Sequence, residues 1–184
     1  MGHENCVLHR LAGIEGVPES FGKVDACTLS MEYIDAAEDI GESADPDQNH
    51  EPPPVSFFES LKRLMAEVHE RGITHCDIRR RNILRDAYDH PYVIDFATAV
   101  CKTGLGNLAG NPLFCLAKRL DDHTILKLQN SFRPNSLTTE EKEWLNWQPF
   151  YLKVGKFVRR RIYKKWIKPR AWRERLTRLR ERMH

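Results

Sequence analysis

The amino-acid sequence predicts an α+β domain followed by a basic tail. Apolar residues recur at helical spacing after position 56, and two short apolar runs then flank a polar turn, as in a β-hairpin. Helical periodicity returns in the second half of the chain. With 184 residues, of which 41% are apolar, the chain is long enough to bury a core.

The first third of the chain is predicted to hold one helix, one strand and a long loop. The helix is expected over residues 4–11 and ends before Gly13, because glycine readily adopts the left-handed conformation that closes helices. A strand is expected over Leu29–Ile34. Residues 41–54 are rich in Asp, Glu, Ser and Pro, which indicates an exposed loop.

The clearest helix is expected to begin at Ser56. Ser56 and Glu59 fit a capping box, in which each side chain bonds the backbone N–H of the other residue. Gly72 is predicted to end this helix. The apolar positions fall on one face: Phe57, Leu61, Leu64, Met65 and Val68.

A β-hairpin and further helices are expected after this helix. The apolar runs 83–84 and 92–94 enclose a polar turn and predict two short antiparallel strands. One later helix is expected to be capped by Asp121 or Asp122, and another to begin near Thr138.

Basic residues are concentrated at the C-terminal end. Residues 153–184 contain 14 of the 29 Lys and Arg residues but two of the 26 acidic residues, a net charge of +12, so the rest of the chain carries −9. The charge pattern therefore divides the chain into a domain, residues 1–152, and a tail, residues 153–184. An acidic body with a basic tail suggests that the tail meets an anionic partner.

The sequence indicates a cytoplasmic protein. There is no run of about 18 apolar residues that would predict a membrane-spanning helix. The N-terminus lacks the apolar core of a secretory signal. The cysteine count is odd, at five, and no C-x-x-C occurs, which argues against a disulfide framework or a zinc site.

The residues that carry chemistry lie between the central helix and the end of the hairpin. His75, Asp77 and Asn82 form the pattern H-x-D-x-x-x-x-N, and Asp95-Phe96 follows the hairpin. Phosphoryl transfer needs a carboxylate to orient the attacking hydroxyl and accept its proton, and oxygen ligands to hold Mg²⁺ against the phosphates. Asp77 suits the first role, Asn82 and Asp95 suit the second, and His75 is expected to brace the loop. Each residue alone is typical of an ordinary turn, but their joint occurrence favours a chemical role.

This pattern resembles the catalytic loop and D-F-G segment of the protein-kinase-like superfamily. The H-C-D and R-R-R-N sequences are most similar to small bacterial kinases of the RIO type and the lipopolysaccharide-core (Kdo) type. The resemblance implies a protein-kinase-like fold, with a truncated N-lobe and hinge in residues 1–40 and a helical C-lobe in residues 55–152. It implies ATP and Mg²⁺ or Mn²⁺ as cofactors. The implied reaction transfers the γ-phosphate to a hydroxyl of a protein or of a lipid-linked sugar.

The resemblance also assigns roles outside the catalytic loop. Glu4 stands four residues ahead of Leu8, as does the ion-pairing glutamate on a kinase helix. Glu32 and Tyr33 resemble the hinge that contacts adenine through backbone groups. Arg79 stands where many protein kinases have Lys, and it would offset phosphate charge with a different geometry.

The sequence departs from the kinase pattern in two more places. No G-x-G-x-x-G loop or V-A-I-K lysine precedes Glu4, and Lys23 comes after the expected helix. Ala97 replaces the glycine of D-F-G, which restricts the backbone after the metal ligand. Two alternatives to an active kinase therefore stay open. One is an inactive pseudokinase that serves as a binding module, and the other is a fragment whose gene continues upstream of Met1.

The basic tail is predicted to form two amphipathic helices that lie on an anionic membrane surface, at the inner face of the membrane. Its apolar residues recur at helical spacing on both sides of Pro169. Phe157, Ile162 and Trp166 precede the proline, and Trp172, Leu176 and Leu179 follow it. Packing of this stripe on the domain is the main alternative, and nucleic-acid binding is less favoured.

Cosedimentation with lipid vesicles tests the tail. We expect the full chain to bind anionic vesicles at low salt and to release them at high salt, because each basic residue near an anionic surface adds about 1 kcal/mol that salt screens. A chain ending at residue 152 should stay in the supernatant. Equal behaviour of the two chains, or equal binding to neutral vesicles, would contradict the prediction.

Overall fold

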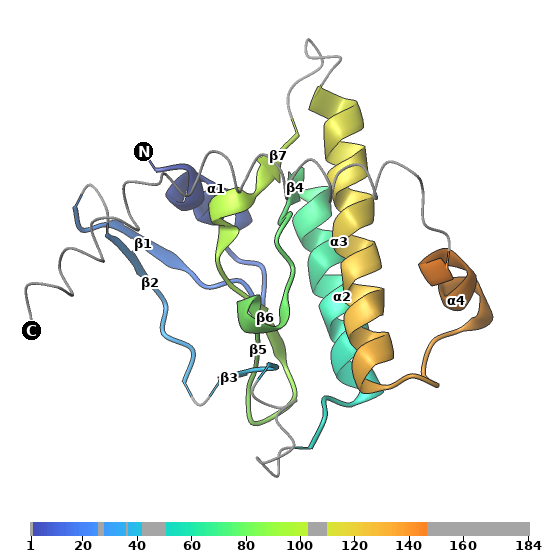
Figure 1. Cartoon of the computed structure of the whole chain (residues 1–184). Helices are drawn as coiled ribbons and strands as arrows, with labels where there is room; N and C mark the ends of the chain where they lie inside the picture. The colour runs from blue at the N-terminus through green and yellow to red at the C-terminus, as the bar shows by residue number, and fades with distance from the viewer. Residues whose placement is uncertain (1, 26–27, 36, 42–50, 103–109, 147–184) are drawn as a thin grey trace, which may run out of the picture. The chain divides into compact units, whose positions relative to one another are not determined.

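The computed structural model describes residues 2–25, 28–35, 37–41, 51–102 and 110–146 (Figure 1). Contacts divide the chain into a compact unit, Met1–Leu145, and a second unit, Asn146–His184. The predicted basic tail lies outside the described residues, as does most of the predicted loop at 41–54. No helix in the described ranges is long and apolar enough to cross a bilayer.

The first unit combines helices with short strands. In chain order its elements are α1 (His3–Leu11), β1 (Ser20–Lys23), β2 (Leu29–Met31), β3 (Glu38–Asp39), α2 (Val55–Glu70), β4 (Ile73–Thr74), β5 (Ile83–Arg85), β6 (Pro91–Val93), β7 (Val100–Cys101), α3 (Gly110–Phe132) and α4 (Thr139–Asn146). The described strands form three antiparallel sheets, β1-β2, β3-β5-β6 and β4-β7. The predicted α+β class is therefore confirmed.

The predicted hairpin is β5–β6, in which Leu84 lies opposite Tyr92. Its turn is closed by the Asp86 carboxylate, which accepts hydrogen bonds from the backbone N–H groups of Tyr88 and His90, each at 2.8 Å. Burial alone would raise the pKa of Asp86, but hydrogen bonds from His90 and Tyr88 outweigh it and lower the pKa. The hairpin register thus depends on a turn that one side chain holds together.

Helix α2 confirms the predicted apolar face, whereas the predicted capping box is wrong. Its first residue is Val55, its N-cap is Pro54, and no side chain caps it, so Ser56 and Glu59 form no capping box. Proline presets the backbone angle that leads into a helix, and the Phe57 N–H already bonds the Pro54 carbonyl at 3.2 Å. Gly72 closes the helix as predicted, with φ +72° and an N–H···O bond to His69 at 2.9 Å.

The predicted cap at Asp121 or Asp122 is wrong, because α3 runs through both residues. The sequence has no glycine or proline between Pro112 and the end of α3, so nothing interrupts the helix there. A capping box does occur at α4: the Thr138 hydroxyl accepts from the Glu141 N–H at 3.2 Å, and the Glu141 carboxylate accepts from the Thr138 N–H at 2.9 Å. The predicted helix start near Thr138 is confirmed.

The expected strand at Leu29–Ile34 is shorter than predicted and has an unpredicted partner. It ends at Met31, where β2 pairs with β1. Strand β1 is four residues long and contains Gly22 at φ +97°, so its sequence shows little of the apolar alternation that marks a strand. The predicted helix at residues 4–11 is confirmed as α1.

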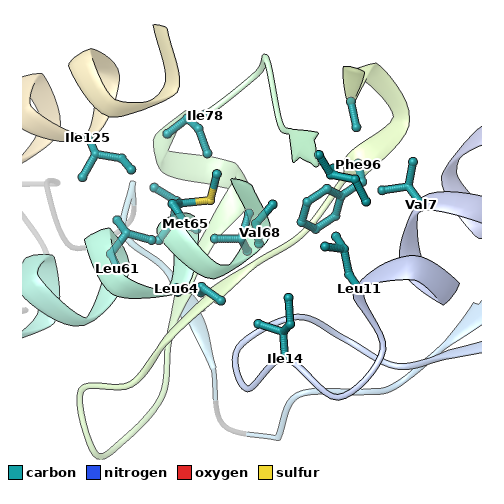
Figure 2. Close-up of a cluster of buried hydrophobic side chains, with 14 of the residues drawn as sticks. Val7, Leu11, Ile14, Leu61, Leu64, Met65, Val68, Ile78, Phe96 and Ile125 are labelled. Atoms are coloured by element: carbon teal, nitrogen blue, oxygen red, sulfur yellow. The ribbon is translucent and has the colours of Figure 1, made fainter. Parts of the chain in front are cut away.

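One hydrophobic core joins α1, α2, the hairpin and α3 (Figure 2). The largest side chains below 2% exposure include Phe57, Phe58, Leu11, Met65 and Phe96. Burying a side chain of this size contributes about 1.5–3 kcal/mol relative to exposure. Phe96 follows Asp95 directly, so the core holds the chain next to a predicted metal ligand.

Gly16 connects the N-terminal segment to this core. It is buried with φ +90°, and its carbonyl accepts the Val93 N–H at 2.8 Å. A Cβ at this position would lie 2.6 Å from the Pro91 carbonyl oxygen and 2.8 Å from a Leu64 methyl group. Gly13 also has a positive φ, +83°, but a Cβ there would meet nothing within 4 Å.

These two glycines form a matched pair for a stability measurement. Gly13→Ala and Gly16→Ala should each cost about 1–2 kcal/mol for the left-handed backbone. Gly16→Ala should cost about 1–3 kcal/mol more, because its methyl group overpacks the junction of α2 and β6. Urea denaturation of the full chain measures the difference, and equal losses would contradict the packing at Gly16.

Candidate active site

The sheet β4-β7 brings the two parts of the predicted motif together. Thr74, which leads into the loop, lies opposite Val100 in the strand that follows Asp95. The Thr74 hydroxyl also donates to the Val100 carbonyl at 3.2 Å. Backbone pairing alone thus holds the start of the loop beside the segment that follows Asp95, although the two are far apart in the sequence.

His75 is fully buried and connects the loop to the segment before Asp95. Its Nδ1 accepts the Asp77 N–H at 3.2 Å, and its Nε2 lies 2.9 Å from the Ile94 carbonyl oxygen. Since Nδ1 is the acceptor, Nε2 carries the proton and donates it to Ile94. The ring also packs on Phe96, with centroids 4.8 Å apart. These are the contacts of a side chain that braces the loop.

Asn82 connects the same two segments a second time. Its Nδ2 donates to the Asp77 carbonyl oxygen at 3.0 Å, and its backbone carbonyl accepts the Ile94 N–H, also at 3.0 Å. The side chain is 6% exposed. Because Nδ2 is committed to Asp77, the amide oxygen on the other branch of the side chain is oriented by the same bond.

Asp95 lies at a strained point of the backbone. Its φ of +65° and ψ of +68° are left-handed, a conformation that residues with a Cβ adopt at a cost of about 1–3 kcal/mol. Aspartate tolerates it better than most residues. Cys76, on the predicted catalytic loop, has φ +64°. Asp95 is exposed while Phe96 is buried, so the core holds the strained turn and leaves the carboxylate accessible.

The three arginines that follow Asp77 have different surroundings. Arg79 forms an ion pair with the Asp77 carboxylate, and its own side chain is 51% exposed. Arg80 lies over the Phe132 ring and donates to the Ser131 hydroxyl at 3.2 Å, which fixes it to α3. Arg81 is exposed. The positive charge nearest to the Asp77 carboxylate therefore belongs to Arg79.

The other predicted site residues lie outside this hydrogen-bonded group. Glu4 is half-buried on α1 and has no ion-pair partner among the described residues. Its neighbour His3 contacts the Ala99 carbonyl at 2.7 Å, which places α1 against the turn after Asp95. The backbone N–H of Glu32 donates to the Glu19 carbonyl at 2.8 Å. Of the two backbone groups of Glu32, only the carbonyl could therefore form a hydrogen bond with adenine. Tyr33 is 84% exposed.

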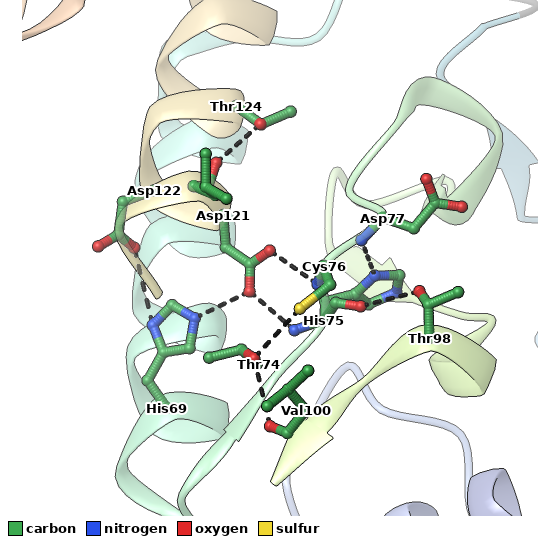
Figure 3. Close-up of polar contacts among 11 residues, drawn as sticks. His69, Thr74, His75, Cys76, Asp77, Thr98, Val100, Asp121, Asp122 and Thr124 are labelled. Atoms are coloured by element: carbon green, nitrogen blue, oxygen red, sulfur yellow. Dashed lines mark hydrogen bonds and ion pairs between the residues drawn. The ribbon is translucent and has the colours of Figure 1, made fainter. Parts of the chain in front are cut away.

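Asp121 is the site residue that the sequence analysis missed. It is 2% exposed, and its carboxylate accepts the N–H groups of His75 at 2.7 Å and Cys76 at 2.9 Å (Figure 3). The same carboxylate lies 3.2 Å from His69 Nε2. The sequence does carry one sign that Asp121 is buried, its spacing. Asp121 lies four residues from both Ala117 and Ile125, on the buried face of α3.

Cys76 is a packed residue and not an activated nucleophile. Burial raises the pKa of its thiol, the Thr74 hydroxyl 3.4 Å away partly offsets this, and the nearby Asp121 charge raises it further. A thiol with a raised pKa stays protonated and unreactive at neutral pH. Cys76 is therefore a small packed side chain of the loop.

The donor atoms at the site suit a hard cation. Asn82 offers an amide oxygen and Asp95 a carboxylate, and oxygen donors of this kind are those that Mg²⁺ prefers. No group of three or more His, Cys, Asp or Glu side chains that could hold a metal ion occurs in the described part of the chain. A magnesium site here would therefore need nucleotide phosphates and water as further ligands, which is how Mg²⁺ is usually bound.

Comparison with known proteins adds nothing to this picture. No protein-family model matches the chain, and no curated protein matches it either. A functional assignment therefore depends on the geometry and chemistry of the site itself.

Asp121→Asn tests the support of the loop. The amide has one acceptor oxygen where the carboxylate has two, so one buried N–H of His75 or Cys76 loses its partner, at a cost of about 1–3 kcal/mol. Asp89→Asn is the control, since it removes only a surface pair with Arg85 worth about 0–1 kcal/mol. Chemical denaturation compares them, and an equal loss from the two would contradict a supporting role for Asp121.

Proposed function

We propose that this chain is an ATP-dependent phosphotransferase with a protein-kinase-like site. The observation that carries the proposal is the double connection between Asp77 and the residue before Asp95. The N–H of Asp77 and the carbonyl of Ile94 bond to the His75 ring. The carbonyl of Asp77 and the N–H of Ile94 bond to Asn82. Three of these bonds use the side chains of His75 and Asn82, and phosphoryl transfer requires a base and metal ligands held at fixed separation.

The proposed roles follow from exposure and chemistry. Asp77 would orient the acceptor hydroxyl and take its proton, while Asn82 and Asp95 would hold Mg²⁺ or Mn²⁺ against the phosphates of ATP. The metal would offset charge on the phosphates when bound. Arg79, beside the Asp77 carboxylate, would add positive charge near the transferred group. Glu4, Glu32 and Tyr33 remain candidates for the nucleotide side of the site.

The acceptor is proposed to be a hydroxyl of a protein or of a lipid-linked sugar. A lipid-linked acceptor is consistent with the basic composition of residues 153–184, which would place the protein at the inner face of a membrane. The competing proposal is that the chain is an inactive pseudokinase, or a fragment of a kinase, which serves as a binding module. The ion pair between Arg79 and Asp77 is compatible with an inactive site, because the carboxylate of the candidate base already has a positively charged partner.

Two substitutions separate the proposed roles. Asp95→Asn should remove Mg²⁺-dependent ATP binding, because a metal ligand loses its charge. Asp77→Asn should leave binding largely intact and lower the transfer rate by about 10²–10⁴. Isothermal titration with ATP and Mg²⁺, together with an ATPase assay, measures both effects. Asp89→Asn is a matched control, since Asp89 has φ +66° and Asp95 has φ +65°.

Each outcome has a distinct meaning. Binding without measurable turnover in the unmodified chain would favour the inactive binding module. If the unmodified chain binds ATP and Mg²⁺ no better than the Asp95→Asn variant, the proposed function fails.

A further inference from the structure

A cavity separate from the candidate active site lies between α2, the turn after α1 and the β5–β6 hairpin. Its volume is about 360 Å³, near the lower end of the range of about 300–1,000 Å³ that is typical of small-molecule sites. None of the residues placed in the candidate active site lines it. The cavity is therefore a second candidate site, and its size suits a small ligand.

The floor of this cavity is formed by its buried lining residues, Gly16, Leu64 and Pro91. A Cβ at Gly16 would lie 2.6 Å from the Pro91 carbonyl oxygen and 2.8 Å from a Leu64 methyl group, so only glycine fits where the three elements meet. The Gly16 carbonyl also accepts the Val93 N–H at 2.8 Å, which joins the floor to β6. A packed floor with apolar side chains favours a ligand that has an apolar part.

The exposed residues around the floor carry opposite charges that do not pair with each other. Arg63 and Glu67 lie one turn apart on α2, a spacing at which side chains often form an ion pair. Arg63 Nη2 instead donates to the Ser60 hydroxyl at 3.0 Å. The carboxylates of Glu67 and Glu15 have no hydrogen-bond or ion-pair partner among the described residues. One guanidinium and two carboxylates thus line the cavity without neutralising one another.

We propose that this cavity binds a free α-amino acid as a zwitterion. Its carboxylate would lie on Arg63, its ammonium group between Glu67 and Glu15, and its apolar side chain on the floor. An α-amino acid carries both charges on one carbon atom, so it can lie between a guanidinium and a carboxylate that are one helical turn apart. The guanidinium suits this role because its planar fork of N–H groups matches the geometry of a carboxylate.

The hairpin side of the cavity favours the ammonium group beside Glu15. Tyr92 lines this side, and burial raises the pKa of its phenol, with the charges of Asp86, Glu32 and Glu15 raising it further. The negative charge of Glu15 therefore acts on this wall. His90 also lines the cavity, but its Nδ1 lies 3.1 Å from the Asp86 carboxylate, so that nitrogen is already engaged. A cationic group is consequently attracted to this end of the cavity.

Binding of three related probes to the full chain tests which charges the ligand must carry. L-Leucine has both charged groups, leucinamide lacks the carboxylate, and N-acetyl-leucine lacks the ammonium group. We expect isothermal titration to show that L-leucine binds at least about fivefold more tightly than either analogue, because each analogue loses a charged hydrogen bond. No detectable binding of L-leucine, or equal binding of the three probes, would overturn the proposal. This comparison needs no variant, so it does not depend on a variant's folding.

Substitutions in the cavity assign each charge to a side chain. In Arg63→Gln the advantage of L-leucine over leucinamide should disappear. In Glu67→Gln its advantage over N-acetyl-leucine should shrink, because only Glu15 is left for the ammonium group. Glu70→Gln is the matched control, since it removes another exposed carboxylate of α2 that does not line the cavity. An equal loss in Glu70→Gln and Glu67→Gln would overturn the proposal, because L-leucine would then respond to net charge and not to this cavity.

Amide chemical shifts of the unmodified chain locate the bound probe. Addition of L-leucine should shift the resonances of Gly16, Leu64 and Tyr92, whereas shifts confined to the loop around Asp77 would overturn the proposal. The titrations contain neither ATP nor Mg²⁺. The inference can therefore succeed or fail independently of the proposed phosphotransferase function.

Discussion

The site depends on four hydrogen bonds that hold two peptide segments together. His75 and Asn82 each bond to the backbone of Asp77 and to the backbone of Ile94. Because these four bonds engage N–H and C=O groups, they fix the main chain without using the carboxylates of Asp77 and Asp95. Loss of the His75 side chain would leave backbone groups of both Asp77 and Ile94 without these partners, and loss of the Asn82 side chain would do so for the Asp77 carbonyl, which is costly away from water.

Two further contacts, one apolar and one polar, hold the segments that these hydrogen bonds join. On one side Phe96, fully buried in the core, holds the strained turn that exposes Asp95. On the other side Asp121 brings a buried carboxylate from the middle of α3 to the N–H groups of His75 and Cys76. Burying a charge is unfavourable unless several donors satisfy it, and Asp121 has three. An apolar contact and a polar contact thus support the two segments that meet at His75.

The N-terminal segment is joined to this arrangement by one main-chain contact and one side-chain contact. Gly16 contacts β6 through its carbonyl group, and His3 contacts the Ala99 carbonyl after the Asp95 turn. Strand pairing elsewhere is limited to strands of two to four residues, so much of the stability of this unit comes from the shared core.

The sequence by itself determined the features that depend on local patterns. Helical spacing predicted the apolar face of α2, two apolar runs around a polar turn predicted the β5–β6 hairpin, and the Thr138–Glu141 pattern predicted the start of α4. The spacing of Asp77, Asn82 and Asp95 singled out two residues that the structure connects to each other and a third whose preceding residue, Ile94, is connected to them. Local patterns are informative because they reflect backbone geometry within one or two turns of the chain.

Only the tertiary structure decided where long-range partners lie. Asp121 looked like a helix cap, because a lone aspartate carries no sign of a partner 46 residues earlier in the chain. Ser56 fitted a capping box, yet the preceding prolines start the helix first. Likewise, His69 has no sequence signal that separates it from a surface histidine. Its meeting with Asp121 and Asp122 arises because α2 and α3 pack together, and packing is a property of the folded chain as a whole.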